Sequence, residues 1–257
     1  MEYKRFAEFC DACKEDRYPG ICLGPSGVGK TLAARHYAQW KFFNHFTNPH
    51  LEKLPIPDAQ LLLGCDTVIY TPWVSMTANS VIVQLLSLMG TFEATLLKQL
   101  KEQGSPNPSA DEARVRLIII DEANRLKYQA IEHIRDLFDQ LHIGIVLLGL
   151  HGLEKYVARL PQFRNRLGFR HEFRPLSTQD MLDILESEML NDLEYGITNQ
   201  DFDHRDTVKA LVRATGGNMR TLHRLCLQIK RVMRINKLDL ITKDVIDAAR
   251  RALIIGL

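Results

Sequence analysis

Two kinds of hydrophobic pattern follow each other along the chain. In the first part, four short apolar or β-branched runs indicate buried strands at residues 21–23, 67–71, 116–122 and 143–149. Helical patterns lie before and between these runs, at residues 6–14, 32–43, 79–89, 92–103 and 128–141. Strands that alternate with helices in this way are typical of a parallel sheet covered on both faces. The pattern therefore predicts an α/β fold.

The pattern changes near Pro175, after which only helical periodicity remains. Helices are predicted at residues 178–190, 206–215, 220–235 and 243–253. Ser177 and Thr242 precede the first and the last of them, and both are residue types that cap helix N-termini. We therefore expect an α/β core over residues 1–175 and a small, all-helical lid over residues 176–257.

The helix predicted at residues 128–141 has one apolar face. Its apolar residues recur at helical spacing and are Ile131, Ile134, Leu137, Phe138 and Leu141. Arg135 and Asp136 fall on the other side, and we expect them to face solvent.

A glycine-rich segment follows the first predicted strand. Residues 24–31 read Gly-Pro-Ser-Gly-Val-Gly-Lys-Thr, which fits the phosphate-binding pattern G-x-x-x-x-G-K-[ST] without a gap. The backbone N–H groups of such a loop bind phosphate oxygens, the lysine reaches the β- and γ-phosphates, and the hydroxyl of Thr31 binds Mg²⁺. The predicted ATP-binding residues are Gly24, Pro25, Ser26, Gly27, Val28, Gly29, Lys30, Thr31 and Leu32.

Two acidic residues end the strand predicted at residues 116–122. The aliphatic run is long enough for a central strand, and ligands of α/β sheets gather at the carboxyl ends of such strands. We expect Asp121 to hold Mg²⁺, together with Thr31, and to belong to the nucleotide site. We expect Glu122 to act as the general base that activates water against the γ-phosphate. Together with the glycine-rich loop, this pair predicts ATP hydrolysis.

Composition adds limits on location and on partners. The 257 residues include no uninterrupted apolar run of about 18 residues, and the N-terminus lacks the apolar segment of a signal peptide. The five cysteines are scattered, and Cys10 and Cys13 share the apolar face of the first helix, which favours packing over metal binding. We therefore expect a cytoplasmic protein without a membrane partner. The formal net charge of +2 neither requires nor excludes a nucleic-acid partner.

Basic residues cluster in two places. Between Thr207 and Leu238 there is no acidic residue and there are eight basic ones, of which Arg220, Arg224, Arg231 and Arg234 share one helix face. The other candidates for DNA binding are Lys98, Lys101, Arg125 and Lys127. The alternatives are a solvated helix face in the first case and local salt bridges of Arg125 and Lys127 in the second.

With the phosphate loop, the Asp-Glu strand and the helical lid, the chain resembles the AAA+ ATPases. Residues 119–127 read Ile-Ile-Asp-Glu-Ala-Asn-Arg-Leu-Lys, and Ile-Arg-Asp at 134–136 and Gly-Ile-Val-Leu-Leu-Gly at 144–149 follow. This order of phrases is similar to that of the transposition regulators, namely the phage Mu B protein and the transposon ATPases TnsC and TniB. The resemblance covers roughly residues 20 to 235.

The resemblance implies three further site residues. Arg166 falls where such proteins place an arginine finger that enters the neighbouring subunit's site, with Arg164 as the close competitor. Arg220 matches the "sensor 2" arginine, which contacts the γ-phosphate. Leu150 stands where "sensor 1" has a threonine or asparagine, so we expect either that His151 substitutes for that residue or that hydrolysis is slow.

The resemblance also implies a function. We expect an ATP-dependent, sequence-tolerant regulator of transposition that binds double-stranded DNA and oligomerises on it as a ring or filament. It would recruit a transposase, with a target-selection protein as a further partner, and would disassemble on hydrolysis. Two other functions share the same core: an ATPase of a protein-secretion or assembly system, and a replication initiator or helicase loader.

Overall fold

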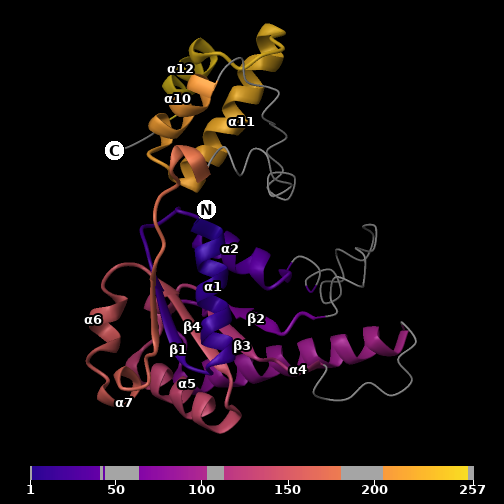
Figure 1. Ribbon diagram of the computed structural model, residues 1–257, viewed down its shortest axis with the longest axis vertical. Helices are drawn as coiled ribbons and strands as arrows, with labels where there is room; N and C mark the ends of the chain where they lie inside the picture. The colour runs from indigo at the N-terminus through magenta and orange to yellow at the C-terminus, as the bar shows by residue number, and fades with distance from the viewer. Residues whose placement is uncertain (1, 41–42, 44–63, 103–112, 181–204, 254–257) are drawn as a thin grey trace. The chain divides into compact units, whose positions relative to one another are not determined.

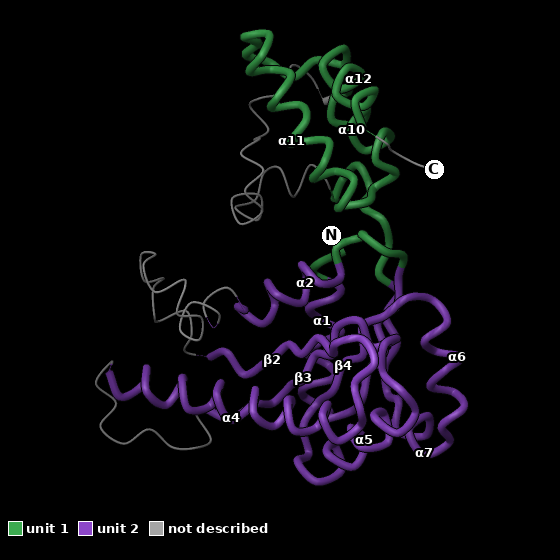
Figure 2. The backbone as a smooth tube through the Cα atoms, turned by 180° about the vertical axis from the view of Figure 1, so that it is seen from behind, with its two compact units in different colours: residues 1–4, 25–29, 173–257 green, residues 5–24, 30–172 purple. Residues whose placement is uncertain are grey.

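The computed structural model describes residues 2–40, 43, 64–102, 113–180 and 205–253, and these residues form two compact units (Figure 1). Unit 1 comprises residues 1–4, 25–29 and 173–257, and unit 2 comprises residues 5–24 and 30–172 (Figure 2). The chain passes from unit 2 to unit 1 for the last time at Phe173, two residues before the domain boundary expected at 175. Unit 1 also takes in the residues of the glycine-rich segment from Pro25 to Gly29.

Unit 2 is built on a parallel sheet of five strands. The strands are β1 (Pro19–Leu23), β2 (Thr67–Tyr70), β3 (Leu117–Ile120), β4 (Gly144–Gly149) and β5 (Phe169–Glu172). Their spatial order is β2-β3-β4-β1-β5, and every pairing is parallel. The predicted α/β fold with a parallel sheet is therefore confirmed.

Two helical layers cover the sheet, and each takes alternate residues of the strands. On one face, strand residues such as Ile118 and Leu147 belong to a core cluster with residues of α4 (Ala78–Glu102) and α5 (Tyr128–Leu141). On the other face lies α1 (Glu2–Glu15), and a Cβ added at Gly144 would come within 2.5 Å of the backbone oxygen of Cys13. Glycine at this position therefore lets α1 approach the sheet closely.

Three predicted helices of unit 2 have other limits in the structure. The helix that follows the glycine-rich segment, α2, spans Lys30–Tyr37 and ends six residues before the predicted end at 43, because Gln39 has a left-handed backbone with φ 50°. The helices predicted at 79–89 and 92–103 form a single helix, α4. Gly90 costs a helix only about 1 kcal/mol, and burial of both Met89 and Phe92 in the core offsets it.

Helix α4 bears on the expectation that the chain has no membrane-spanning segment. Among the described residues it is the one helix that is long and apolar enough to cross a membrane, by length and composition alone. Its buried residues recur every three or four positions along one face and include Val81, Leu85, Phe92 and Leu96. This spacing is typical of an amphipathic helix that covers a sheet, and these residues belong to the core cluster of unit 2.

The last strand and two short helices of unit 2 were not predicted. Strand β5 reads Phe-Arg-His-Glu and lies at the edge of the sheet, with intermediate and exposed residues in alternation. A search for apolar runs misses this strand, because none of its four residues is fully buried and two of them are charged. The helices α6 (Leu153–Val157) and α7 (Pro161–Arg164) have five and four residues, which is too short for a periodic pattern.

The helical part of unit 1 follows the prediction where it is described. Its helices are α10 (Arg205–Thr215), α11 (Met219–Asn236) and α12 (Lys243–Arg251), which pack against one another. Thr242 caps α12 by accepting the backbone N–H of Val245, and Ser177 Oγ accepts the N–H of Asp180 at 3.1 Å. Both predicted caps are confirmed. Most of the helix predicted at 178–190 lies outside the described residues.

The five cysteines are buried and free, which confirms the packing interpretation. Cys10 and Cys13 have no exposed surface. Burial raises the pKa of the Cys13 thiol to about 12 and that of Cys226 to about 12. These thiols are therefore protonated near neutral pH and behave as small apolar side chains.

Candidate functional site

The carboxyl ends of the central strands bring the predicted site residues of unit 2 to one edge of the sheet. Leu23 at the end of β1 lies opposite Gly149 at the end of β4. Gly24, which begins the glycine-rich loop, donates its N–H to the backbone oxygen of Gly149 at 3.3 Å. Asp121, which follows β3, donates its N–H to the backbone oxygen of Tyr70 at the end of β2 at 2.8 Å. This is the edge at which α/β sheets bind ligands.

The end of the glycine-rich loop and the first acidic residue meet at this edge. Lys30 begins α2, and its Nζ donates to the backbone oxygen of Gly24 at 2.8 Å. The hydroxyl of Thr31 donates to Asp121 Oδ2 at 2.7 Å. Asp121 is almost fully buried, with 4% of its surface exposed. The sequence places these residues 90 positions apart, and the sheet brings them into direct contact.

The donor set of Thr31 and Asp121 fits a magnesium ion bound together with phosphates. A hydroxyl and a carboxylate supply hard oxygen ligands, and Mg²⁺ in nucleotide sites takes one or two carboxylates plus substrate phosphates and water. Asp121 Oδ1 accepts the backbone N–H of Glu122 at 2.9 Å, so both carboxylate oxygens are oriented. Within the described ranges no group of three His, Cys, Asp or Glu side chains could hold a metal alone. Thr31 and Asp121 would therefore supply part of the octahedral shell of Mg²⁺, and phosphate oxygens and water would supply the rest.

Glu122 leaves the strand in a strained conformation. Its backbone is left-handed, with φ 53° and ψ 39°, which is uncommon for a residue with a side chain and concentrates at functional sites. The side chain is 41% exposed, and Oε2 lies 3.9 Å from Nη2 of Arg125. Arg125 also donates to the backbone oxygen of Pro72 at 3.2 Å. The carboxylate of Glu122 is thus open to water, as a general base must be. Arg125 is bound locally by Pro72 and lies near Glu122.

In unit 1, the start of α11 holds the middle of the glycine-rich loop. The side-chain amide of Asn218 donates to the backbone oxygen of Ser26 at 2.8 Å. Arg220 Nη1 lies 3.1 Å from Ser26 Oγ, and the backbone N–H of Arg220 donates to the backbone oxygen of Gly27 at 3.1 Å. The arginine predicted as sensor 2 therefore lies directly against the phosphate loop.

Asn218 is a further site residue, which no motif in the sequence singles out. Its Nδ2 donates to Ser26, and its Oδ1 accepts the N–H groups of Arg220 and Thr221 and so caps α11. A Cβ added at Gly27, where φ is 79°, would lie 2.6 Å from this Oδ1. The signal was available, because asparagine just before a helical pattern is among the best N-caps. The contact with Ser26 joins residues 192 positions apart, and no local pattern predicts it.

The predicted sensor 1 position lies at the end of β4. Leu150 is 41% exposed, and His151 is exposed beside it. Asn124 supplies another polar group here, since its Oδ1 would lie 3.4 Å from a Cβ added at Gly149. This asparagine belongs to the predicted segment after Asp121, but it was not singled out as a site residue.

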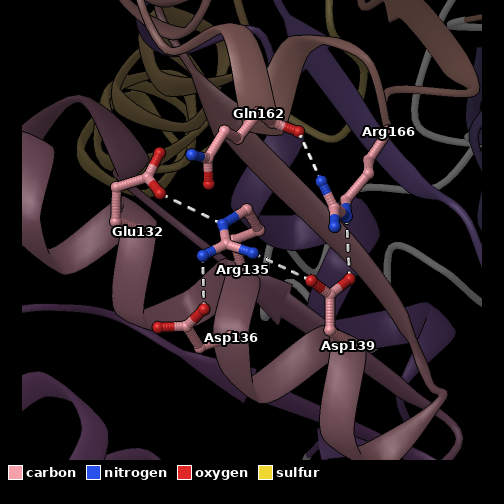
Figure 3. A network of polar contacts seen from close by, with 6 residues as sticks. All are labelled: Glu132, Arg135, Asp136, Asp139, Gln162 and Arg166. Carbon is pink, nitrogen blue, oxygen red and sulfur yellow. Dashed lines mark hydrogen bonds and ion pairs between the residues drawn. The ribbon is translucent and has the colours of Figure 1, made fainter.

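Arg166 takes part in a network of charged side chains in unit 2 (Figure 3). Its Nε donates to Asp139 Oδ1 at 2.8 Å, and its Nη1 donates to the backbone oxygen of Gln162 at 2.9 Å. Arg135 lies in the same network with only 15% of its side chain exposed. The expectation that Arg135 faces solvent is therefore wrong. Three carboxylates of α5 bind its guanidinium and keep the side chain folded along the helix, mostly covered from solvent. Arg164, the competing finger candidate, is exposed at the end of α7.

The predicted DNA-binding residues lie in both units, and most are exposed. On α11, Leu222, Leu225 and Ile229 are buried, whereas Arg224 and Arg231 are exposed, as the amphipathic pattern predicts. In unit 2, Lys127 precedes α5, and the exposed residues Lys98 and Lys101 lie in the last turns of α4. Lys98 Nζ lies 3.8 Å from the carboxylate of Glu102, which is a surface pair of small energetic value.

Comparison with known proteins places this geometry in a family. A family model described as "AAA domain" matches residues 13–157, more than half of the chain. The chain is also 36% identical, over 262 residues, to a Staphylococcus aureus protein described as a "Potential ATP-binding protein". That alignment covers 100% of this chain and 96% of the relative.

Solved structures show the same fold at low sequence identity. The RuvB Holliday junction branch migration motor of Thermotoga maritima superposes with a TM-score of 0.60 at 16% identity, over 98% of this chain and 68% of that one. The ORC2 protein of Aeropyrum pernix, solved in ADPNP and ADP complexes, gives 0.61 at 14% identity, over 97% and 66% of the two chains. At such identities the likeness concerns the fold alone.

Proposed function

Because the chain belongs to the AAA domain family and has an AAA+ ATPase fold, we propose that it is an ATP-gated regulator of DNA transposition. In the ATP-bound state it assembles on double-stranded DNA as a ring or helical filament, largely without regard to sequence. The assembly recruits a transposase, with a target-selection protein as a further partner, and hydrolysis to ADP and phosphate takes it apart. We place this activity in the cytoplasm.

The contact between Thr31 and Asp121 carries the ATPase part of the proposal. The hydroxyl of Thr31 at the start of α2 and the buried carboxylate of Asp121 lie 2.7 Å apart and would hold Mg²⁺, which would offset negative charge on the bound phosphates. Lys30 directly precedes Thr31 in the chain, and its ammonium group would neutralise phosphate charge. Glu122 then accepts the proton of the attacking water. Leu150 provides no side-chain hydrogen bond at the sensor 1 position, which supports a slow turnover below about 1 s⁻¹, the low end for ordinary enzymes.

Support for DNA binding comes from the exposed basic face of α11 and from the resemblance to transposition regulators. In the described part of the chain, Arg224, Arg231 and Arg234 form no ion pair with an acidic residue. An arginine that is not neutralised by its own protein can bind a DNA phosphate and release a counterion. Contacts of this kind do not read the base sequence. A regulator that marks DNA of any sequence needs this property.

The proposal is tested by fluorescence anisotropy of labelled duplexes of two unrelated sequences. Binding is compared without nucleotide, with ADP, and with a non-hydrolysable ATP analogue and Mg²⁺, each at two salt concentrations. We expect tight binding only with the analogue, equal for both sequences and weakened by salt. Arg231→Ala should reduce the slope of log K against log salt by about 1, as the loss of one phosphate contact does.

Other outcomes would contradict the proposal in different ways. A strong preference for one duplex would indicate an initiator that reads a sequence. No binding in any nucleotide state would exclude DNA as the partner and favour an assembly ATPase that acts on a protein. The proposed ATP site would be unaffected by that result.

A further inference from the structure

Asp139 connects two arginines, one of which is the predicted finger Arg166 (Figure 3). Asp139 Oδ1 accepts from Arg166 Nε at 2.8 Å, and Oδ2 accepts from Arg135 Nη1 at 2.9 Å. Arg135 is one turn earlier on α5, and Arg166 follows α7. A single carboxylate thus uses both oxygens to hold guanidinium groups from two parts of unit 2.

The guanidinium of Arg166 is held at two of its three nitrogens. Nε is bound by Asp139, and Nη1 is bound by the backbone oxygen of Gln162. Within the part of the chain that the structure describes, Nη2 makes no hydrogen bond, and the side chain is 37% exposed. The plane of the guanidinium is therefore set by its own chain, while Nη2 remains open to an anion from outside.

Arg135 in turn fixes Asp139. Its side chain is only 15% exposed, and its guanidinium binds Glu132 Oε2 at 3.1 Å as well as Asp136 and Asp139, all on α5. Charge-assisted bonds between guanidinium and carboxylate groups are directional, so an arginine shared by three carboxylates leaves each of them little freedom. The carboxylates of α5 thus orient Arg135, Arg135 orients Asp139, and Asp139 orients Arg166.

We propose that Asp139 is a positioning residue for Arg166. It holds the guanidinium so that Nη2 meets the γ-phosphate bound to a neighbouring copy of the chain. This inference rests on the proposed function, since it requires ATP to be bound where two copies meet. A finger that is oriented before the partner arrives does not have to be ordered during the reaction, and a misplacement of about 1 Å can cost on the order of 10²-fold in rate.

The test compares two isosteric variants, Asp139→Asn and Asp136→Asn. Both remove one negative charge from the same network, but Asp136 is 54% exposed and contacts Arg135 rather than Arg166. Steady-state ATPase rates are measured with Mg²⁺ and duplex DNA. The protein concentration is set high enough that the rate per subunit no longer rises with it, so that the copies are fully assembled. We expect Asp139→Asn to lower kcat by about 10- to 100-fold with KM changed by less than about 3-fold. Asp136→Asn should stay within about 2-fold of the wild type in both constants.

A double-mutant cycle separates positioning from general stability. Arg166→Ala should lower kcat by about 10³-fold or more, as the loss of an arginine finger does. Adding Asp139→Asn to Arg166→Ala should then have no further effect, because the group that it positions is gone. A residue that only stabilises the fold would lower the rate in both backgrounds and would lower the melting temperature in proportion.

Three results would overturn the inference while the ATPase proposal stands: equal kcat values for Asp139→Asn and Asp136→Asn, losses that multiply in the cycle, or a fully active Arg166→Ala. The absence of turnover in the wild-type protein would overturn the proposed function itself.

Discussion

Replacing Asn218 tests how the start of α11 contributes to nucleotide binding. This side chain has two separable contacts, one to the backbone oxygen of Ser26 and one to the N–H groups of its own helix. Asn218→Ser keeps a side-chain oxygen that caps the helix equally well, but serine is too short to reach Ser26. Asn218→Ala removes both contacts. The pair of variants therefore separates the loop contact from the cap.

The geometry sets the size of the expected effects. A neutral hydrogen bond contributes about 0.5–1.5 kcal/mol, and the contact between Asn218 and Ser26 is exposed, which favours the lower half of that range. The backbone bond from Arg220 to Gly27 also remains and limits the loss. We therefore expect Asn218→Ser to bind ATP about 2- to 5-fold more weakly, with unchanged stability. Asn218→Ala should show the same loss of affinity and, in addition, lose about 1 kcal/mol of unfolding free energy with the cap.

The assay is a titration with a fluorescent ATP analogue, paired with urea denaturation in the absence of nucleotide. ATP affinity of Asn218→Ser equal to that of the wild type would refute the idea that the contact organises the loop. Tighter binding would refute it as well, since the contact would then compete with the nucleotide.

Four further predictions follow from the same structure. Glu122→Gln should keep ATP binding but lower turnover by about 10²- to 10⁴-fold, measured as phosphate release; equal losses in binding and turnover would contradict the general-base role. Thr31→Ala should raise the Mg²⁺ concentration needed for half-maximal ATPase activity, because it removes a proposed ligand, and a magnesium titration checks this. Thr242→Ala should lower the free energy of unfolding by about 1 kcal/mol, because the bond to the N–H of Val245 is lost, as measured in urea. The pKa of the Cys226 thiol is raised from 9.0 unfolded to about 12 folded, so its contribution is fully present below pH 9 and is lost as the pH rises toward 12; Cys226→Ala should flatten that decline in urea experiments.

The sequence predicts those parts of the fold whose signals are local. All residues of β1, β2, β3 and β4 are buried, and these strands appear in the sequence as apolar or β-branched runs. Helix α5 was predicted with its observed limits, Tyr128 to Leu141. The edge strand β5 was missed because its residues alternate between intermediate and exposed positions. Helix α4 was split at Gly90, since the burial that offsets the glycine depends on packing against the rest of the core.

The same distinction applies to the site. The glycine-rich loop and the pair Asp121 and Glu122 are compact motifs, so the sequence identifies them directly. The contacts of Asn218 with Ser26 and of Asp139 with Arg166 join separate segments of the chain, 192 and 27 positions apart. Arg135 shows what a helical pattern cannot predict. Its position on α5 predicts an exposed side chain, whereas ion pairs with three carboxylates leave only 15% of that side chain exposed.

The central claim is that ATP gates assembly of this chain on DNA, and the most direct measurement is the mass of protein bound per duplex. Mass photometry is carried out on duplexes of increasing length, with a non-hydrolysable ATP analogue or with ADP. The account predicts that bound mass increases with duplex length in the presence of the analogue only, and that Lys30→Ala abolishes the increase. A bound mass that is independent of duplex length, or that is the same with ADP, would contradict it.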